Sequence, residues 1–112
     1  MKRTVTGACL SLLLMASGVS AASFDCRQAE LPDEKAICAD RHLSDLDVEM
    51  AVKFHFLKGL MAMGKSGEMS DSQQVWLKKR QSCKGNVGCL NRQYQQRIAE
   101  LDALYAGIDK PL

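Results

Sequence analysis

Apolar side chains recur three and four residues apart along this sequence, and this spacing restricts its fold more than any other feature. The clearest series places six side chains on one helical face: Leu43, Leu46, Met50, Phe54, Leu57 and Met61. A second series predicts a helix over residues 87–106: Leu90, Tyr94, Ile98, Leu101 and Tyr105. No stretch alternates convincingly between apolar and polar residues, as a half-buried strand would. We therefore predict an all-α fold, a small bundle of about four helices.

Local signals predict where these helices begin and end. Leu31-Pro32-Asp33-Glu34 indicates the start of a short first helix that ends near Asp40-Arg41, because Pro suits the first turn and acids suit the positive end of the helix dipole. Ser44 to Asp47 resembles a capping box for the second helix, and Gly64 and Gly67 predict its end. A third helix should start at Ser70 or Ser72, and a tight turn should follow at Gly85-Asn86 and Gly88. The last helix should end at Gly107 and Pro111.

The first twenty-one residues have the pattern of a secretory signal peptide. Lys2 and Arg3 precede an apolar stretch, and Val19-Ser20-Ala21 places small residues where a signal peptidase requires them. The apolar stretch is shorter than the roughly 20 residues that a membrane-spanning helix needs. We predict cleavage after Ala21, with cleavage after Ala22 as the next choice and an uncleaved anchor as the alternative. One periplasmic or secreted domain over residues 22–112 then remains, without a membrane anchor.

Four of the five cysteines follow the predicted signal peptide. An even number of cysteines in an oxidising compartment predicts two disulfides. We expect the sequence-local pairs Cys26–Cys38 and Cys83–Cys89, although four cysteines permit three connectivities and the sequence alone does not choose among them. Each small loop would stabilise the domain by about 2–3 kcal/mol. The cysteine spacing lacks the two close pairs of a structural zinc site.

Charge is unevenly distributed along the predicted mature chain. Residues 22–71 hold ten acidic and six basic residues, whereas residues 72–112 hold three acidic and seven basic ones. This neutral total does not suit nucleic-acid binding. The two halves either attract each other inside the bundle or offer an acidic surface to a basic protein partner. The acids that we expect on such a surface are Asp33, Glu34, Asp45 and Glu49.

No arrangement of residues predicts catalysis or a cofactor. Only His42 and His55 are of the residue type that could act as a general base near neutral pH, and no serine lies in a nucleophile-elbow pattern. Asp45 and Asp47 are two residues apart, so they point to different sides of a helix. We therefore predict a protein that is not an enzyme and has no metal site. One group of side chains has the soft ligands that copper prefers: Met61, Met63, Met69 and His55. Copper binding is therefore an alternative role for this group, although flexible methionines also fill small cores.

One helical side carries an aromatic residue between polar ones. Gln73, Trp76 and Arg80 lie three and four residues apart. We predict that Trp76 anchors the core. Arg80 either pairs with an acid on a neighbouring helix or forms a binding hot spot. Asp47 and Arg97 are candidate partners because they lie on facing helices.

The residues also match a family pattern that runs from about Cys26 to Leu101. Its parts are Glu34-x-x-Ile37-Cys38, Leu43-x-x-Leu46-Asp47, Phe54, Gln73-x-x-Trp76-Leu77-x-x-Arg80-x-x-Cys83, Cys89 and Tyr94-x-x-Arg97-x-x-x-Leu101. The sequence thereby resembles the LprI-like lysozyme-inhibitor family. It departs from the family at Phe54, where Tyr is frequent, and at Gln81, where an acid is frequent. The signature residues are Leu46, Asp47, Gln73, Trp76, Arg80, Tyr94 and Arg97.

The resemblance implies an all-α domain with two disulfides, in the periplasm or at the cell surface, without a cofactor. It maps no inhibitory loop onto named residues. We expect a secreted binding protein that inhibits lysozyme or a related peptidoglycan-cleaving enzyme. The alternatives are an immunity protein against a toxin delivered to the periplasm, and an envelope stress or metal-binding protein.

Overall fold

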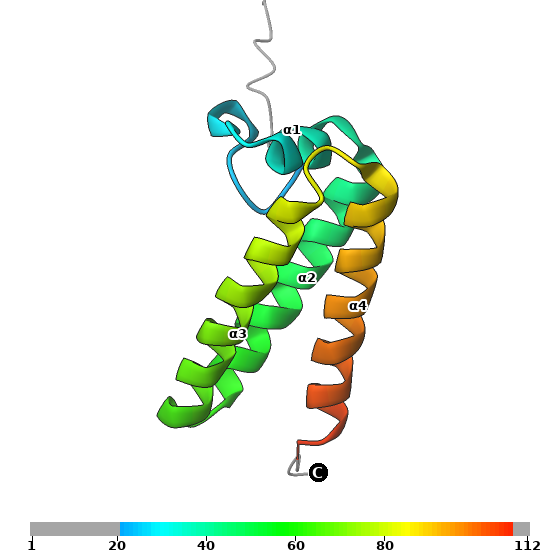
Figure 1. Ribbon diagram of the computed structural model, residues 1–112. Coiled ribbons are helices and arrows are strands. Elements are labelled where there is room, and N and C mark those ends of the chain that lie inside the picture. Colours follow the sequence, from blue (N-terminus) through cyan, green and yellow to red (C-terminus); the bar gives the residue numbers. More distant parts are fainter. Residues whose placement is uncertain (1–20, 109–112) are drawn as a thin grey trace, which may run out of the picture.

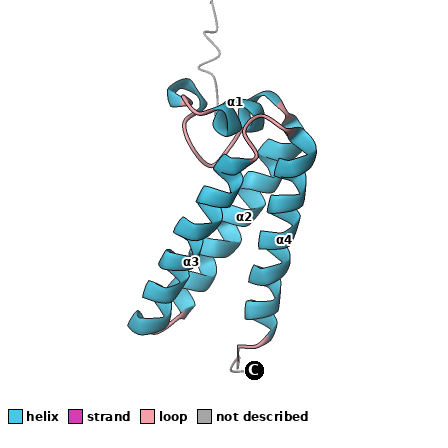
Figure 2. Cartoon of the chain, viewed as in Figure 1, coloured by secondary structure: helices cyan, strands magenta, loops and turns pink. Residues whose placement is uncertain are grey.

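Four α-helices and one short 3₁₀ turn make up the regular structure of residues 21–108, the part of the chain that the computed structural model describes (Figure 2). The turn spans Cys26–Gln28 (η1), and the helices span Pro32–Ala39 (α1), Arg41–Leu60 (α2), Met63–Ser82 (α3) and Val87–Ala106 (α4). The described residues contain no strand, and the predicted all-α fold is confirmed. The predicted signal peptide lies, except for Ala21, outside the described residues, as does Pro111.

The three long helices run side by side, and α1 lies across one end of them (Figure 1). α2 and α3 form a hairpin, and α4 makes its most extensive contact with α2. Toward the end opposite α1, α4 diverges from α3 (Figure 1). The bundle therefore has a closed end, which α1 and the N-terminal arm cover, and an open end.

The start of α2 differs from the prediction. Asp40 is its N-cap, and the Asp40 side chain accepts a hydrogen bond of 3.0 Å from the backbone N–H of Leu43. Ser44 lies inside the helix and donates its hydroxyl to the carbonyl oxygen of Ile37 at 2.6 Å. Because the last carbonyls of α1 have no partner within their own helix, Ser44 satisfies one of them. The predicted capping role of Ser44 is therefore wrong.

The α2–α3 connection also differs from the prediction. α2 ends at Leu60 and α3 begins at Met63, so neither Gly64 nor Gly67 ends a helix. A Cβ atom at either glycine would meet no atom within 4 Å, so no close approach requires a glycine there. Both glycines lie in the first turns of α3, which begins before Ser70 and Ser72. α3 therefore includes two residues of weak helix propensity in its first turns.

The turn between α3 and α4 has its special backbone conformation at Lys84, not at a glycine. Lys84 has φ of 52°, a left-handed conformation that favours glycine. Asn86 is the N-cap of α4, and its side chain accepts a hydrogen bond of 2.8 Å from the N–H of Cys89. The predicted start of the last helix near residue 87 and its end at Gly107 are confirmed.

The two disulfides join the pairs expected from the sequence. Cys26–Cys38 links η1 to α1, and its Cα atoms are 5.8 Å apart. Cys83–Cys89 closes the turn between α3 and α4 with a Cα separation of 5.5 Å. Both bridges therefore lie at the closed end and hold the short segments there.

The core follows the two predicted series with exceptions at their ends. On α2 four members of the series are buried, whereas Leu46 and Met61 are partly buried against the core. On α4 the series is buried up to Leu101, but Tyr105 is 42% exposed because it lies at the open end. Trp76 of α3 is buried, as predicted, and its ring packs edge-on against Tyr94 at a centroid distance of 5.1 Å.

Candidate functional site

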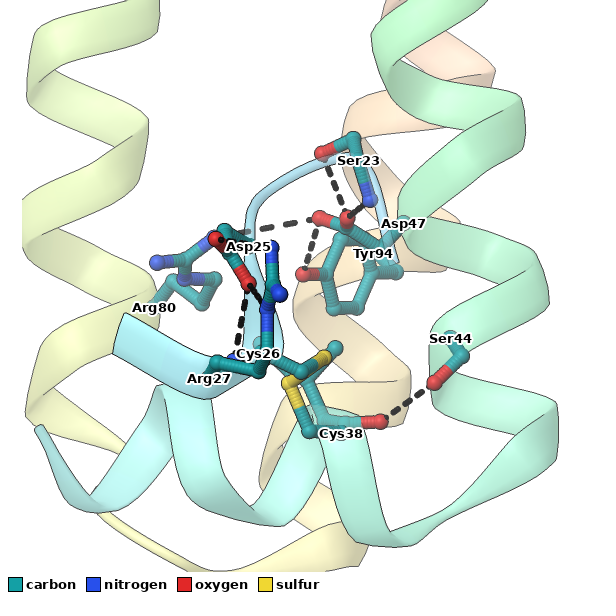
Figure 3. Close-up of a disulfide and its surroundings, with 10 residues drawn as sticks. Ser23, Asp25, Cys26, Arg27, Cys38, Ser44, Asp47, Arg80 and Tyr94 are labelled. Carbon is teal, nitrogen blue, oxygen red and sulfur yellow. Dashed lines mark hydrogen bonds and ion pairs between the residues drawn. A yellow bond between two sulfur atoms is a disulfide. The ribbon is translucent and has the colours of Figure 1, made fainter. Parts of the chain in front are cut away.

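The most deeply buried charged group of the described residues is the carboxylate of Asp47 on α2 (Figure 3). One of its oxygens accepts hydrogen bonds from the backbone N–H of Ser23, at 2.7 Å, and from the Ser23 hydroxyl. The other oxygen accepts from the Tyr94 hydroxyl at 2.7 Å and lies 3.8 Å from Nη1 of Arg80. Asp47 therefore connects the N-terminal arm with α2, α3 and α4.

Arg80 forms its closest ion pair with Asp33 on α1. Nε of Arg80 lies 2.8 Å from Oδ2 of Asp33, and both side chains are buried. The guanidinium also lies over the rings of Phe24, at 5.6 Å, and Trp76, at 5.9 Å. The structure therefore assigns Arg80 a pairing role inside the bundle. The prediction that Asp33 belongs to a partner-binding surface is wrong, because Asp33 is only 1% exposed.

Arg97 belongs to a second, adjacent cluster. Its Nε donates to the Gln73 side-chain oxygen at 3.0 Å, and its Nη2 donates to the Ser72 hydroxyl at 3.0 Å. Glu100 lies 3.0 Å from its Nη1. The suggested partnership of Arg97 with Asp47 is not observed, because Tyr94, one turn earlier on α4, occupies the position next to Asp47.

The electrostatics of the first cluster keep Tyr94 and Arg80 protonated. Burial, and then the negative charge of Asp47, raise the pKa of Tyr94 far above its ordinary value, so its hydroxyl stays protonated and donates. Burial opposes the charge of Arg80, but the interactions with Tyr94 and Asp33 outweigh it and raise the pKa of Arg80. Every buried side-chain polar atom of the described residues has a hydrogen-bond partner. The polar groups of the cluster therefore bind one another, and these contacts fix the positions of the helices that carry them.

The structure brings most of the signature residues together. The polar members divide between the Asp47 cluster and the Arg97 cluster, and Trp76 packs between them against Tyr94 and donates its indole N–H to the Gln93 carbonyl at 3.1 Å. Leu46 packs against the core from a partly buried position. These residues therefore support the closed end and middle of the bundle.

Of the remaining predicted acids, Asp45 and Glu49 lie on the exposed side of α2. Glu49 contacts Lys53 at 3.2 Å, and Lys53 also contacts Asp102 of α4 at 2.7 Å. Glu34 is partly buried on α1, where its carboxylate accepts from the backbone N–H of Leu31 at 3.1 Å. Asp45 and Glu49 are therefore the two predicted acids that share one exposed helical face.

Beside these acids runs a feature that the sequence reasoning missed. Val48, Val52, Phe56 and Leu60 are 39%, 62%, 56% and 52% exposed, and they follow one another at four-residue intervals along α2. We call these four residues the outer ridge. Val48, Val52 and Phe56 each lie about 200° around the helix from a residue of the core series two positions away, so they face away from the core. Leu60 follows Phe56 at the end of α2. The sequence signal for the outer ridge was a second set of apolar residues at four-residue spacing, which alternates along α2 with the core series.

Tyr105 of α4 extends the apolar surface at the outer ridge. Its ring centroid lies 6.2 Å from that of Phe56. Both rings line a shallow depression of about 180 Å³ between α2 and α4, together with Lys53, Leu57, Leu101 and Asp102. The outer ridge is therefore continuous with apolar atoms of a second helix.

The methionines proposed as soft metal ligands are not gathered with His55. Met61 and Met69 line a cavity of about 510 Å³ at the open end, and Met63 is 93% exposed. His55 lines a different pocket, of about 280 Å³, beside Ser23. Within residues 21–108, no group of three or more His, Cys, Asp or Glu side chains is arranged to hold a metal ion.

The fold and the site define an all-α, disulfide-bonded module with buried ionic clusters and an exposed apolar ridge. Comparison with protein-family models, with curated proteins and with solved structures finds no match. No helix among the described residues is long and apolar enough to cross a membrane. The two disulfides are compatible with an extracellular location.

Proposed function

We propose that this chain is an exported protein-binding module that inhibits a peptidoglycan-cleaving enzyme, specifically a lysozyme. The outer ridge carries this proposal. A row of four large apolar side chains on the solvent side of a small bundle is unusual in a soluble protein unless a partner covers it. Apolar residues held in line by one helix are also the usual anchors of helix-mediated recognition.

The charges beside the ridge favour a basic partner. Asp45, Glu49 and Asp102 are exposed there. Lys53, which contacts Glu49 and Asp102, and the exposed Arg41 are the cations on this side of α2, so acids outnumber bases on this surface. Complementary charge speeds encounter and selects among partners. Animal lysozymes are commonly basic, and a module bound across the glycan cleft of such an enzyme would exclude its substrate.

The rigidity of the bundle suits an inhibitor. Two disulfides and the Asp47 cluster hold α1, the N-terminal arm and the long helices together, so little conformational freedom would be lost on binding. The resemblance to the LprI-like family supports lysozyme as the enzyme to test first.

The test measures lysis of a cell-wall suspension by a basic animal lysozyme, followed as loss of turbidity. We expect the purified protein to slow lysis and Val52→Glu to weaken the inhibition at least about tenfold, as loss of a central apolar anchor does. Val75→Glu is the matched control, because Val75 is 55% exposed on α3, outside the ridge. This control should inhibit like the unchanged protein, and circular dichroism should show that both variants are folded.

Three outcomes contradict different parts of the proposal. Full lytic activity at a large molar excess of the unchanged protein would exclude lysozyme as the target. Inhibition that survives Val52→Glu would exclude the outer ridge as the binding surface. Sedimentation that shows a dimer only when Val52 is present would mean that a second copy covers the ridge.

A further inference from the structure

The charges of the Asp47 cluster do not balance. Asp33 and Asp47 are both buried, and Arg80 is the one cation that the described contacts place between them. The fourth group, Tyr94, is neutral because its pKa is raised. Burying a carboxylate without a compensating cation costs free energy. A second positive charge beside Asp47 would therefore stabilise this fold.

The N-terminal arm brings a backbone nitrogen to this position. Ser23 donates its backbone N–H directly to Oδ2 of Asp47 at 2.7 Å (Figure 3). Ala22, the preceding residue, is 8% exposed and packs with the core. The arm is therefore held inside the closed end of the bundle, at the residues where the sequence predicts signal-peptide cleavage.

We propose that cleavage of the Ala21–Ala22 bond creates an α-ammonium group that forms a buried ion pair with Asp47. Hydrolysis breaks the C–N bond: the hydroxyl of water joins the Ala21 carbonyl carbon, and the other hydrogen of water joins the Ala22 nitrogen, which becomes an amine. At neutral pH this amine takes up a proton, because a free α-amino group has a pKa of about 7.7–8.0. The new charge lies one residue from a nitrogen that already contacts Asp47, and it balances the cluster.

Signal removal thereby has a structural consequence that goes beyond the proposed function. In the precursor the nitrogen of Ala22 belongs to a neutral peptide bond, so the cluster keeps its excess negative charge. Cleavage then favours the folded state more strongly, after the chain has been exported. Cleavage one residue later would place the ammonium on Ser23, at the nitrogen that lies 2.7 Å from Asp47, with the same effect.

The test moves the ammonium without changing the rest of the domain. The full chain is expressed with its signal segment, and mass spectrometry of the processed protein identifies its first residue. A second form carries Gly-Ser inserted between Ala21 and Ala22, which displaces the new terminus from Asp47. We expect the insertion to lower the melting temperature by about 5 °C, the shift ordinarily produced by loss of one favourable buried interaction in a domain of this size.

Two backgrounds show whether Asp47 is responsible. In Asp47→Asn the insertion should cost less than about 1 °C, because the carboxylate that the ammonium pairs with is absent. In the matched Asp45→Asn background, which removes an exposed acid of the same helix, the insertion should cost as much as in the unchanged protein. An equal loss in the Asp47→Asn background would overturn the proposal.

The pKa of the α-amino group is a second readout, and it does not require Asp47→Asn to fold. In the processed protein this pKa should lie above the ordinary range of about 7.7–8.0, and in the insertion form it should lie within that range. The ionisable groups that face Asp47 or line the adjacent pocket enter the fit: Asp33, Glu34, His55, Arg80 and Tyr94. An ordinary pKa in the processed protein, or a first residue other than Ala22 or Ser23, would also overturn the proposal.

Discussion

Removing the positive charge of Arg80 should be the most damaging single polar substitution in the described domain. Arg80→Gln leaves Asp33 and Asp47 buried without the cation that lies 2.8 Å and 3.8 Å from them. Breaking a buried pair from one side costs about 3–5 kcal/mol. Small domains have a total unfolding free energy of about 5–15 kcal/mol, so much of it would be lost. The melting temperature should fall by on the order of 20 °C.

The assay is urea unfolding followed by circular dichroism, with disulfides intact, for the single variants Arg80→Gln and Asp33→Asn and for their combination. The double variant should be more stable than the sum of the single effects predicts, by about 0.5–3 kcal/mol, because it leaves only Asp47 without the Arg80 cation, whereas Arg80→Gln alone leaves both Asp33 and Asp47 without it. A free-energy loss for Arg80→Gln of less than about 1 kcal/mol would refute the reasoning.

An exposed ion pair provides the matched control. Arg27 lies 3.2 Å from Asp25, but its side chain is 79% exposed, so water screens the pair. Arg27→Gln should leave the unfolding midpoint within experimental error. Similar losses for Arg27→Gln and Arg80→Gln would mean that burial does not determine the strength of these pairs.

Further predictions concern the turn, the first turns of α3, alkaline pH and the disulfides. Lys84→Gly should raise the unfolding free energy by about 0.5–1 kcal/mol, measured in urea, because glycine adopts the left-handed backbone without steric cost. Gly64→Ala and Gly67→Ala should each raise it by a similar amount, about 0.5–1 kcal/mol, because the added Cβ meets open space in a helix; a lower melting temperature would contradict the assignment of these glycines to α3. The folded-state pKa of Tyr94 is raised, so its contribution should be complete below the unfolded-state pKa of about 10 and decline as the pH rises further. Urea unfolding between pH 9 and 11 should show this decline and show less of it for Tyr94→Phe. Reduction of both disulfides should lower the free energy of unfolding by about 2–3 kcal/mol per closed loop and should therefore lower the melting temperature. An unchanged melting temperature in reductant would contradict their stabilising role.

The helices could be predicted because their signal is local and repeated. The core residues of α2 and α4 recur with the period of a helix, so the sequence shows which residues form the apolar face of each helix. Cap positions were less predictable, because several residues compete for each of them. Asp40 and Ser44 both suit an N-cap, and the contact of Ser44 with α1 decided between them.

The candidate site was less visible than the fold. The sequence does not distinguish Asp33 from Asp45, yet Asp33 is buried beside Arg80 and Asp45 is exposed. The outer ridge has the same helical spacing as the core series on α2. Which of two apolar faces is covered depends on how the helices meet, and this information is not carried by either series alone.

The sequence by itself determined the helical class and the spacing of the core series, and it made the sequence-local cysteine pairs the expected ones without excluding the others. These features depend on neighbours within a few turns, for which spacing along the chain is a direct measure of distance in space. The tertiary structure decided which charges pair, which apolar face stays exposed and where the N-terminal arm lies. Those outcomes depend on contacts such as Ser23 with Asp47, between residues 24 positions apart, whose distance only the packed bundle determines.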